Sequence, residues 1–190
     1  MCLVKLEPSV ISFNSVISAC NKCKQWQLAL TLLRDMRDEK LDPNVVSYNA
    51  GISACEKGKK WQQAMVLLLE MWQAKLEPND VSYNAGISAC EKGKQWQQAL
   101  ALFREMWQAK LEPSIISFNA GISACEKGVQ WSLALALLSE MAEAKLEPDG
   151  ISYNAGISAC EKGAQWQQAL ALLLEMWEAK VVPDSATTLE

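Results

Sequence analysis

The chain has 190 residues, half of them hydrophobic, and a formal net charge of −4. No apolar run reaches the ~18 residues that span a bilayer, and no basic block indicates a nucleic-acid-binding tail. The absence of histidine removes the commonest general base and the usual nitrogen ligand of zinc. These features argue against a membrane protein and against Ser-His or Cys-His catalysis.

The cysteines follow a regular spacing. Five of the seven are 35 residues apart, namely Cys20, Cys55, Cys90, Cys125 and Cys160. The only CxxC motif is Cys20 with Cys23, and no second pair accompanies it, as a zinc site would require. We therefore predict no metal site and no disulfide framework, and expect small buried side chains instead.

The same period of 35 governs the whole chain. It is shared by the prolines Pro8, Pro43, Pro78, Pro113, Pro148 and Pro183, and by the tryptophans Trp26, Trp61, Trp96, Trp131 and Trp166. Five repeats follow, at 10–44, 45–79, 80–114, 115–149 and 150–184. Residues 1–9 read as the tail of a preceding repeat and residues 185–190 as a C-terminal tail.

Each repeat predicts two helices, as its second copy shows. Tyr48, Ile52 and Cys55 stand at i, i+4 and i+7, on one face of a first helix that Gly58 ends. A longer second helix begins at Trp61, and Leu76-Glu77-Pro78 stops it. Neither helix can bury its apolar stripe alone, so the pattern predicts an all-α solenoid of stacked helix-turn-helix hairpins.

The ends of the chain lack the polar capping helices that solenoids normally carry. Lys5-Leu6-Glu7-Pro8 matches Lys75-Leu76-Glu77-Pro78, and after Asp184 the pattern does not restart, since Thr188 stands where the aromatic belongs. We therefore expect a segment of a longer array, or an incompletely capped one that could associate through its ends.

These residues carry a family resemblance. The general pattern of a unit is an aliphatic pair, Ser, an aromatic and Asn, then Lys-Gly, then Ala-Leu-x-Leu-x-x-x-Met and a closing Lys-Leu-Glu-Pro, with departures in individual units. Over residues 10–184 this resembles the pentatricopeptide repeat (PPR), a family of RNA-binding solenoids. The resemblance implies a right-handed superhelix in which each repeat reads one base of single-stranded RNA.

In that family two side chains per repeat read the base. The first follows the aromatic, here Asn14, Asn49, Asn84, Asn119 and Asn154. Its partner is the last residue of the repeat, here Asn44, Asn79, Ser114, Asp149 and Asp184. The residue two before the aromatic would sandwich the base, here Ile11, Val46, Val81, Ile116 and Ile151. The implied target, read 5′ to 3′, is C/U–C/U–C–U–U.

Simpler interpretations compete with some of these roles. Asn, Ser and Asp before a helix are also the preferred N-cap residues. The lysines Lys22, Lys57, Lys92, Lys127 and Lys162 could contact phosphates, or could complement the negative end of the first helix. The glutamates beside them, such as Glu56, read as solvated charges. The five tryptophans listed above are expected in the core, and Trp72, Trp107 and Trp177 in core or inter-repeat packing.

The favoured function is thus sequence-selective binding of single-stranded RNA, with no cofactor and no catalytic residue predicted. The alternative is a helical scaffold that binds a protein or peptide, which the acidic composition favours. The family resemblance implies RNA processing or stability in a mitochondrion or plastid, although no targeting segment supports that compartment.

Overall fold

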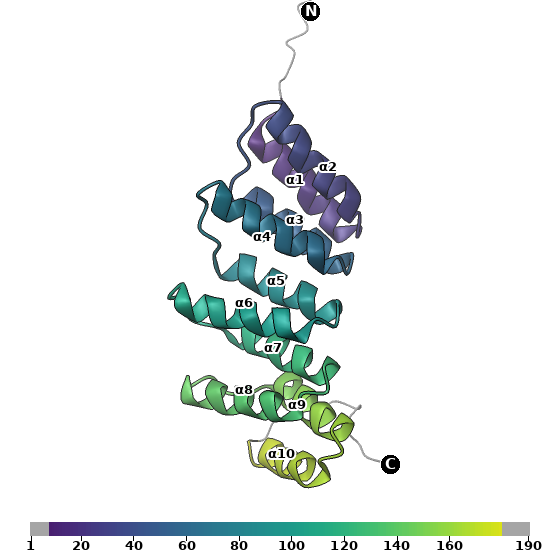
Figure 1. Ribbon diagram of the computed structural model, residues 1–190, viewed down its shortest axis with the longest axis vertical. Coiled ribbons are helices and arrows are strands. Elements are labelled where there is room, and N and C mark those ends of the chain that lie inside the picture. Colours follow the sequence, from purple (N-terminus) through teal and green to yellow (C-terminus); the bar gives the residue numbers. More distant parts are fainter. Residues whose placement is uncertain (1–7, 180–190) are drawn as a thin grey trace, which may run out of the picture. The chain divides into compact units, whose positions relative to one another are not determined.

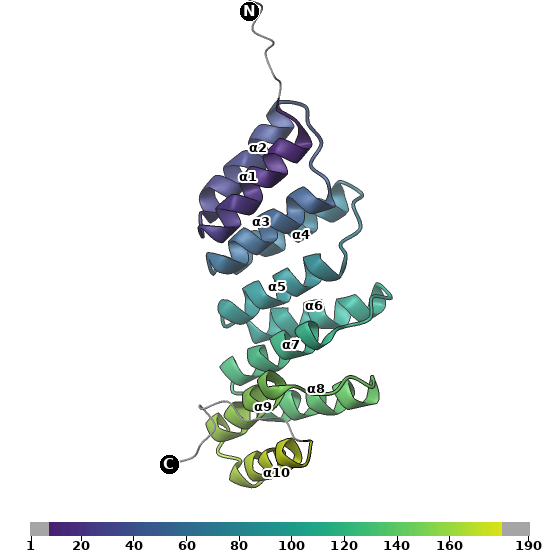
Figure 2. The ribbon, with the colours of Figure 1, turned by 180° about the vertical axis from the view of Figure 1, so that it is seen from behind.

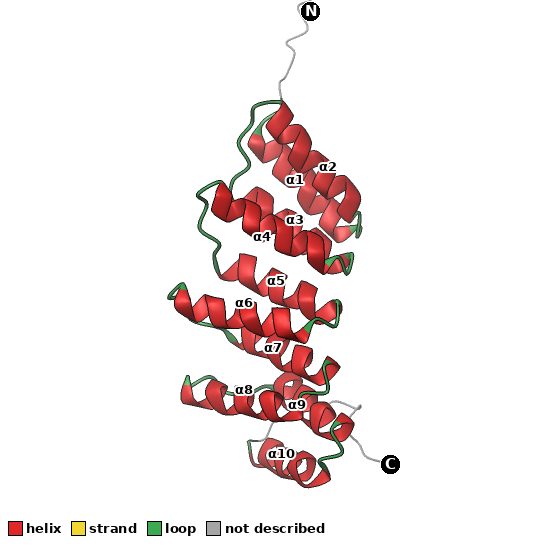
Figure 3. Ribbon diagram, viewed as in Figure 1, coloured by secondary structure: helices red, strands yellow, loops and turns green. Residues whose placement is uncertain are grey.

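The computed structural model describes residues 8–179, and every regular element within that range is an α-helix (Figures 1 and 3). The ten helices of this range are α1 (Val10–Lys22), α2 (Trp26–Asp38), α3 (Val45–Lys57), α4 (Trp61–Gln73), α5 (Asp80–Lys92), α6 (Trp96–Gln108), α7 (Ile115–Lys127), α8 (Trp131–Glu143), α9 (Gly150–Lys162) and α10 (Trp166–Glu178). The predicted all-α class of tandem helical hairpins is confirmed.

The chain divides into two compact units, with the boundary between Ala89 and Cys90 inside α5. In the first unit, α1 packs on α2 and α3 on α4, and α3 also contacts both helices of the preceding hairpin. In the second unit, α7 pairs with α8 and α9 with α10, and α7 and α8 both contact α9. Both views of the ribbon show these hairpins (Figures 1 and 2). The first helices α1 and α7 are thus each packed on their own second helix and on the first helix of the following repeat.

The first helices begin at capping boxes. The Asn44 side chain accepts a hydrogen bond from the Ser47 backbone N–H at 3.1 Å, and the Ser47 hydroxyl accepts one from the Asn44 N–H at 3.1 Å. Asp149 and Ser152 repeat this arrangement at the start of α9. The reciprocal bonds satisfy backbone donors that the first turn of the helix leaves without partners. Because the capping residues recur every 35 residues, the first helices begin at equivalent positions in their repeats.

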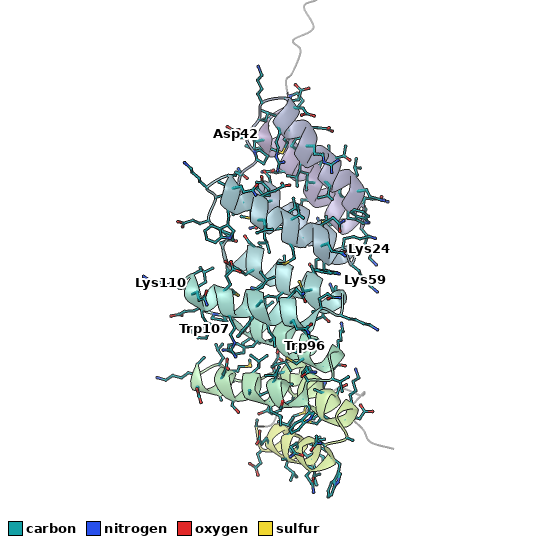
Figure 4. All side chains as sticks on the ribbon, viewed as in Figure 1. Lys24, Asp42, Lys59, Trp96, Trp107 and Lys110 are labelled. Atoms are coloured by element: carbon teal, nitrogen blue, oxygen red, sulfur yellow. The ribbon has the colours of Figure 1, made fainter. Side chains whose placement is uncertain are left out.

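The first helix of the second repeat ends where the sequence predicts, since α3 stops at Lys57 and Gly58 is its C-cap residue. Gly58 itself has an ordinary negative φ of −78°. The left-handed residue is the next one, Lys59, with φ 56°. Lys24 and Lys59 therefore occupy matching turns in the first unit (Figure 4). The glycine has another purpose, which lies in its contact with a tryptophan.

That left-handed turn is strained most at Val129, a half-exposed β-branched residue with φ 56°. We expect Val129→Gly to raise the free energy of unfolding by about 1 kcal/mol, because a non-glycine residue in this region costs about 1–2 kcal/mol. Ala164→Gly, at the matching turn with φ 55°, should gain less because alanine has no β-branch. Urea titration of both variants measures the difference, and a loss of stability in Val129→Gly would refute the strain.

The core consists of the predicted apolar stripes. In the second repeat Tyr48, Ile52 and Cys55 are buried on α3, and Leu68 and Met71 are buried on α4. Burial raises the pKa of the Cys55 thiol to about 12, so this side chain stays protonated and acts as a small apolar group. The spaced cysteines from Cys20 to Cys160 are all buried in first helices, as expected.

The recurrent tryptophans are not core residues, contrary to the prediction. Trp26, Trp61, Trp96 and Trp131 are only partly buried, and Trp166 is 68% exposed. The rings of Trp26, Trp96 and Trp131 lie against the glycine that follows the next repeat's first helix: a Cβ built on Gly58 would be 2.5 Å from Trp26 Cδ1. Lys60 covers the same ring, its Nζ 5.0 Å from the centroid. The tryptophan therefore belongs to a contact between repeats.

The second tryptophan set is also more exposed than predicted. Trp72, Trp107 and Trp177 each leave about half of their surface in solvent. Trp96 and Trp107 occupy opposite ends of α6 (Figure 4). None of the helices within residues 8–179 is both long and apolar enough to cross a membrane.

Candidate nucleic-acid interface

In three repeats, the asparagine that follows the aromatic lies one turn into a first helix and next to the residue that caps the following first helix. In the first unit Asn49 Nδ2 donates to Asn79 Oδ1 at 3.1 Å, and Asn14 Nδ2 donates to Asn44 Oδ1 at 3.4 Å. The two predicted reading positions of a repeat, 30 residues apart in sequence, are therefore neighbours in the structure.

A buried serine, which the sequence did not single out, fixes this pair. Ser82 is fully buried, and its hydroxyl donates to Asn49 Oδ1 at 2.6 Å. The Ser82 hydroxyl oxygen also accepts a hydrogen bond from the Asn79 backbone N–H at 3.1 Å. Because a hydroxyl has a single proton, the short bond to Asn49 sets which way that amide faces. The sequence signal that could have identified this residue is the serine that recurs at the same position of every repeat.

The second unit repeats the arrangement with an aspartate. Asn119 Nδ2 donates to Asp149 Oδ1 at 3.1 Å and to Oδ2 at 3.2 Å, and the Ser152 hydroxyl donates to Asn119 Oδ1 at 2.6 Å. Burial opposes ionisation of Asp149, but hydrogen bonds from Ser152 and Asn119 outweigh it and lower the pKa of the carboxyl. Asp149 is therefore an ionised group that only accepts hydrogen bonds at neutral pH.

The first pair differs from the other two. Here the Ser47 hydroxyl donates to Asn44 Oδ1 at 3.1 Å, and the buried Oδ1 of Asn14 has no hydrogen-bond partner among the described residues. Ser47 thus has the burial and the capping role of Ser82 without its bond to the asparagine amide. Ser47 is therefore a natural control for the effect of the hydrogen bond between Ser82 and Asn49.

The remaining predicted readers are placed individually. Asn84 and Asn154 are partly buried on α5 and α9, and Ser114 is the exposed N-cap residue of α7. The Oδ1 of Asn154 has no partner within residues 8–179. Asp184 lies outside the described residues.

Exposed aliphatic side chains lie beside these polar pairs. The five predicted sandwiching residues are 49–78% exposed, namely Ile11, Val46, Val81, Ile116 and Ile151. Each stands three residues before a reading asparagine, so the two share one face of the helix. Each of these repeats therefore leaves an aliphatic side chain in solvent on the helix face that carries its predicted reading asparagine.

The lysines at the ends of the first helices are partly engaged in ion pairs. Lys162 Nζ lies 2.6 Å from Glu126 Oε1 of the preceding repeat, and Lys127 pairs with Glu91 in the same way. The sequence suggested that these glutamates are solvated charges. The structure instead shows Glu91 and Glu126 in ion pairs with the lysine of the following repeat. Lys22 and Lys57 form no ion pair in the described part of the chain, and Asn21 stands in the first repeat where Glu126 stands in the fourth.

Comparison with known proteins identifies the repeats. A family model described as the PPR repeat family matches residues 8–57, 43–92 and 78–127. The chain belongs to the PPR repeat family. Together these matches cover more than half of the 190 residues, and no curated protein is similar enough in sequence to count as a relative.

Solved structures share the PPR fold with this chain. PPR10 from maize is 23% identical to this chain, with a TM-score of 0.73. The match covers 96% of this chain and 26% of the PPR10 chain. PPR10 in complex with an 18-nt psaJ RNA element is also 23% identical, with a TM-score of 0.72 and coverage of 95% and 30%. The chain thus spans less than a third of the length of PPR10.

The PPR domain of a second protein agrees over most of its length. The PPR domain of Arabidopsis thaliana protein-only RNase P 1, solved in complex with tRNA, has a TM-score of 0.79 at 14% identity, with 91% of each chain covered. At these identities the likeness establishes the fold of the chain.

Proposed function

We propose that this PPR chain binds single-stranded RNA with sequence selectivity, one base per repeat. The observation that carries the proposal is the hydrogen-bonded pair formed by Asn49 with Asn79 and by Asn119 with Asp149, flanked by exposed aliphatic residues. The RNA complexes of PPR10 and of the RNase P PPR domain support this assignment. RNA processing or stability in an organelle is the role that the family resemblance suggests.

The hydrogen-bonding capacity left on each pair favours pyrimidines. Asn49 uses Oδ1 to accept from Ser82 and one N–H to reach Asn79, so one N–H remains for a base acceptor. Uracil and cytosine both offer the O2 carbonyl to such a donor. The asparagine thereby selects the class of base, and its partner distinguishes the two members.

The last residue of each repeat, which pairs with the reading asparagine, distinguishes U from C. Asp149 is an acceptor only and fits the N3–H of uracil, whereas the Asn79 amide can donate to the bare N3 of cytosine. The proposed target is therefore C/U–C/U–C–U–U. Asp184, which completes the last pair, is assigned from the repeat register alone.

Removing one buried serine should blur this discrimination. We expect Ser82→Ala to reduce the preference for pyrimidine over purine at the second base about tenfold, because a freed amide can turn and present its oxygen instead. Ser47→Ala is the matched control: it loses the same capping contact and burial, but Asn14 has no serine bond to lose.

Thermal unfolding should show a loss of stability in both serine variants, larger in Ser82→Ala by about 1 kcal/mol for the extra bond to Asn49, while only Ser82→Ala loses selectivity. Affinities for five-base RNAs that vary at the first or second position measure the effect. Equal loss of selectivity in the two variants, or none in either, would show that the serine only caps its helix.

The proposed function is tested by titration with CCCUU and its purine counterpart GGGAA at several salt concentrations. We expect preference for the pyrimidine strand and a slope of log K against log salt near −1.4, from about −0.7 for each of Lys22 and Lys57. A contribution from all five lysines would give about −3.5 instead. Equal affinity for both strands would contradict the proposal and favour the peptide-binding scaffold.

A further variant tests whether the ion pairs withhold lysines from RNA. Glu126→Gln releases Lys162, so the salt slope should steepen by about 0.7. Glu112→Gln, at an exposed loop position, changes the net charge equally and should leave the slope unchanged. If both variants alter the slope alike, general charge and not the Lys162 pair is responsible.

A further inference from the structure

Two grooves between successive second helices occupy the same place in the repeat. The first lies between α2 and α4 and has a volume of about 110 Å³. The second lies between α8 and α10 and has a volume of about 390 Å³. All eight residues that line the first groove, from Leu30 to Glu70, are matched 105 residues later by residues that line the second, from Leu135 to Glu175. The two grooves are therefore equivalent sites in different repeats, and they differ in the side chains that line them.

In the smaller groove an arginine of the chain occupies the site. Arg37 donates from Nη2 to the Tyr48 hydroxyl at 2.8 Å and pairs with the Glu70 carboxylate. Its guanidinium carbon lies 5.7 Å from the centroid of the Tyr48 ring. The hydrogen bond that Arg37 donates to Glu70 raises the pKa of the Arg37 guanidinium above its ordinary value. Carboxylate, phenol and aromatic face together form a guanidinium site.

In the larger groove the same receiving groups are present without the arginine. Ala142 replaces Arg37 and Ser139 replaces Arg34, which accounts for the larger volume. Tyr153 and Glu175 stand where Tyr48 and Glu70 stand in the smaller groove, and both line the cavity. Burial, together with the charge of Glu175, raises the pKa of the Tyr153 hydroxyl, which agrees with a carboxylate close by and no cation between them.

We propose that the groove between α8 and α10 binds an arginine side chain of a partner protein, with Glu175 and the Tyr153 hydroxyl as acceptors of the guanidinium. No arginine of the 190 residues fills this groove. The chain's three arginines are Arg34, Arg37 and Arg104. The first two line the smaller groove, and Arg104 pairs with Glu140 at 3.3 Å. A partner's arginine would therefore meet acceptors that none of these three occupies.

Arginine fits this site better than lysine. A planar guanidinium donates in two directions at once, so it can reach a carboxylate and a phenol together, and it stacks on an aromatic face. The apolar walls, which include Leu138 and Leu172, suit the methylene stem of a long cationic side chain. An ammonium group has no such fork and gives up more hydration on entering.

The test uses the full chain without RNA and two capped peptides, acetyl-Gly-Arg-Gly-amide and acetyl-Gly-Lys-Gly-amide, followed by NMR titration. We expect saturable binding of the arginine peptide, about fivefold or more tighter than the lysine peptide. Glu175→Gln should weaken it about tenfold. Glu178→Gln, an exposed carboxylate on the same helix, should leave the affinity unchanged.

Ala142→Arg supplies the decisive variant, because it places the chain's own guanidinium in the groove as Arg37 does in the first repeat. It should abolish peptide binding and raise the melting temperature. Equal binding of the two peptides, retained binding in Ala142→Arg, or no saturable binding at tens of millimolar peptide would each overturn the proposal. These outcomes leave RNA binding untouched, since no predicted reading residue lines this groove.

Discussion

Gly128→Ala is expected to lower the free energy of unfolding by about 1–3 kcal/mol, the usual cost of overpacking. A Cβ at this position would lie 2.4 Å from Cδ1 and 2.5 Å from Cγ of Trp96. These atoms are next to the ring's attachment to the chain, so the indole cannot turn away from them. Backbone strain plays no part, because φ of Gly128 is −87°.

The predicted loss of stability in Gly128→Ala is opposite in sign to the usual effect of this substitution. Glycine to alanine within a helix ordinarily gains about 0.5–1 kcal/mol, and Gly121→Ala provides that comparison in the same helix. Its Cβ would lie 3.3 Å from the flexible tip of Leu137, so we expect little change or a gain. Urea unfolding of both variants measures the difference.

A double variant separates the tryptophan contact from other effects. In a Trp96→Ala background the penalty of Gly128→Ala should disappear, since residues in contact show a coupling energy and independent ones do not. A stabilising Gly128→Ala, or one whose cost persists without Trp96, would contradict the role of this contact.

The fold was predictable because its cause is local and repeated. The apolar stripe Tyr48–Ile52–Cys55 and the proline after the second helix each specify one element, and the 35-residue register copies that unit along the chain. The location of the tryptophans was not predictable in this way. Whether Trp26 faces its own hairpin or Gly58 of the next one depends on how hairpins stack, which a single repeat does not determine.

The candidate site was predicted in part for a similar reason. Sequence register related Asn49 to Asn79 through the family resemblance, and the structure adds that the two are hydrogen bonded. The contribution of Ser82 was missed because serine three residues into a helix already has a sufficient explanation as a capping residue. Likewise, Lys162 and Glu126 are 36 residues apart, so their pairing exists only once repeats are stacked.

Asp149→Asn tests base reading most directly, because it separates reading from capping. Asn and Asp are comparable N-cap residues, so the melting temperature should stay level within the few tenths of a kcal/mol that distinguish them. The side chain, however, gains a donor that the carboxylate lacks. A mismatched base leaves a polar group without a partner, at about 1–3 kcal/mol.

The measurement is the affinity of the parent and of Asp149→Asn for CCCUU and CCCCU, with CUCUU as a control whose fourth base is unchanged. The account predicts that the parent prefers CCCUU about tenfold and that the variant prefers CCCCU, while the ratio of CUCUU to CCCUU stays the same in both. An unchanged order of affinity at equal stability would contradict it, and would leave Asp149 as a helix cap alone.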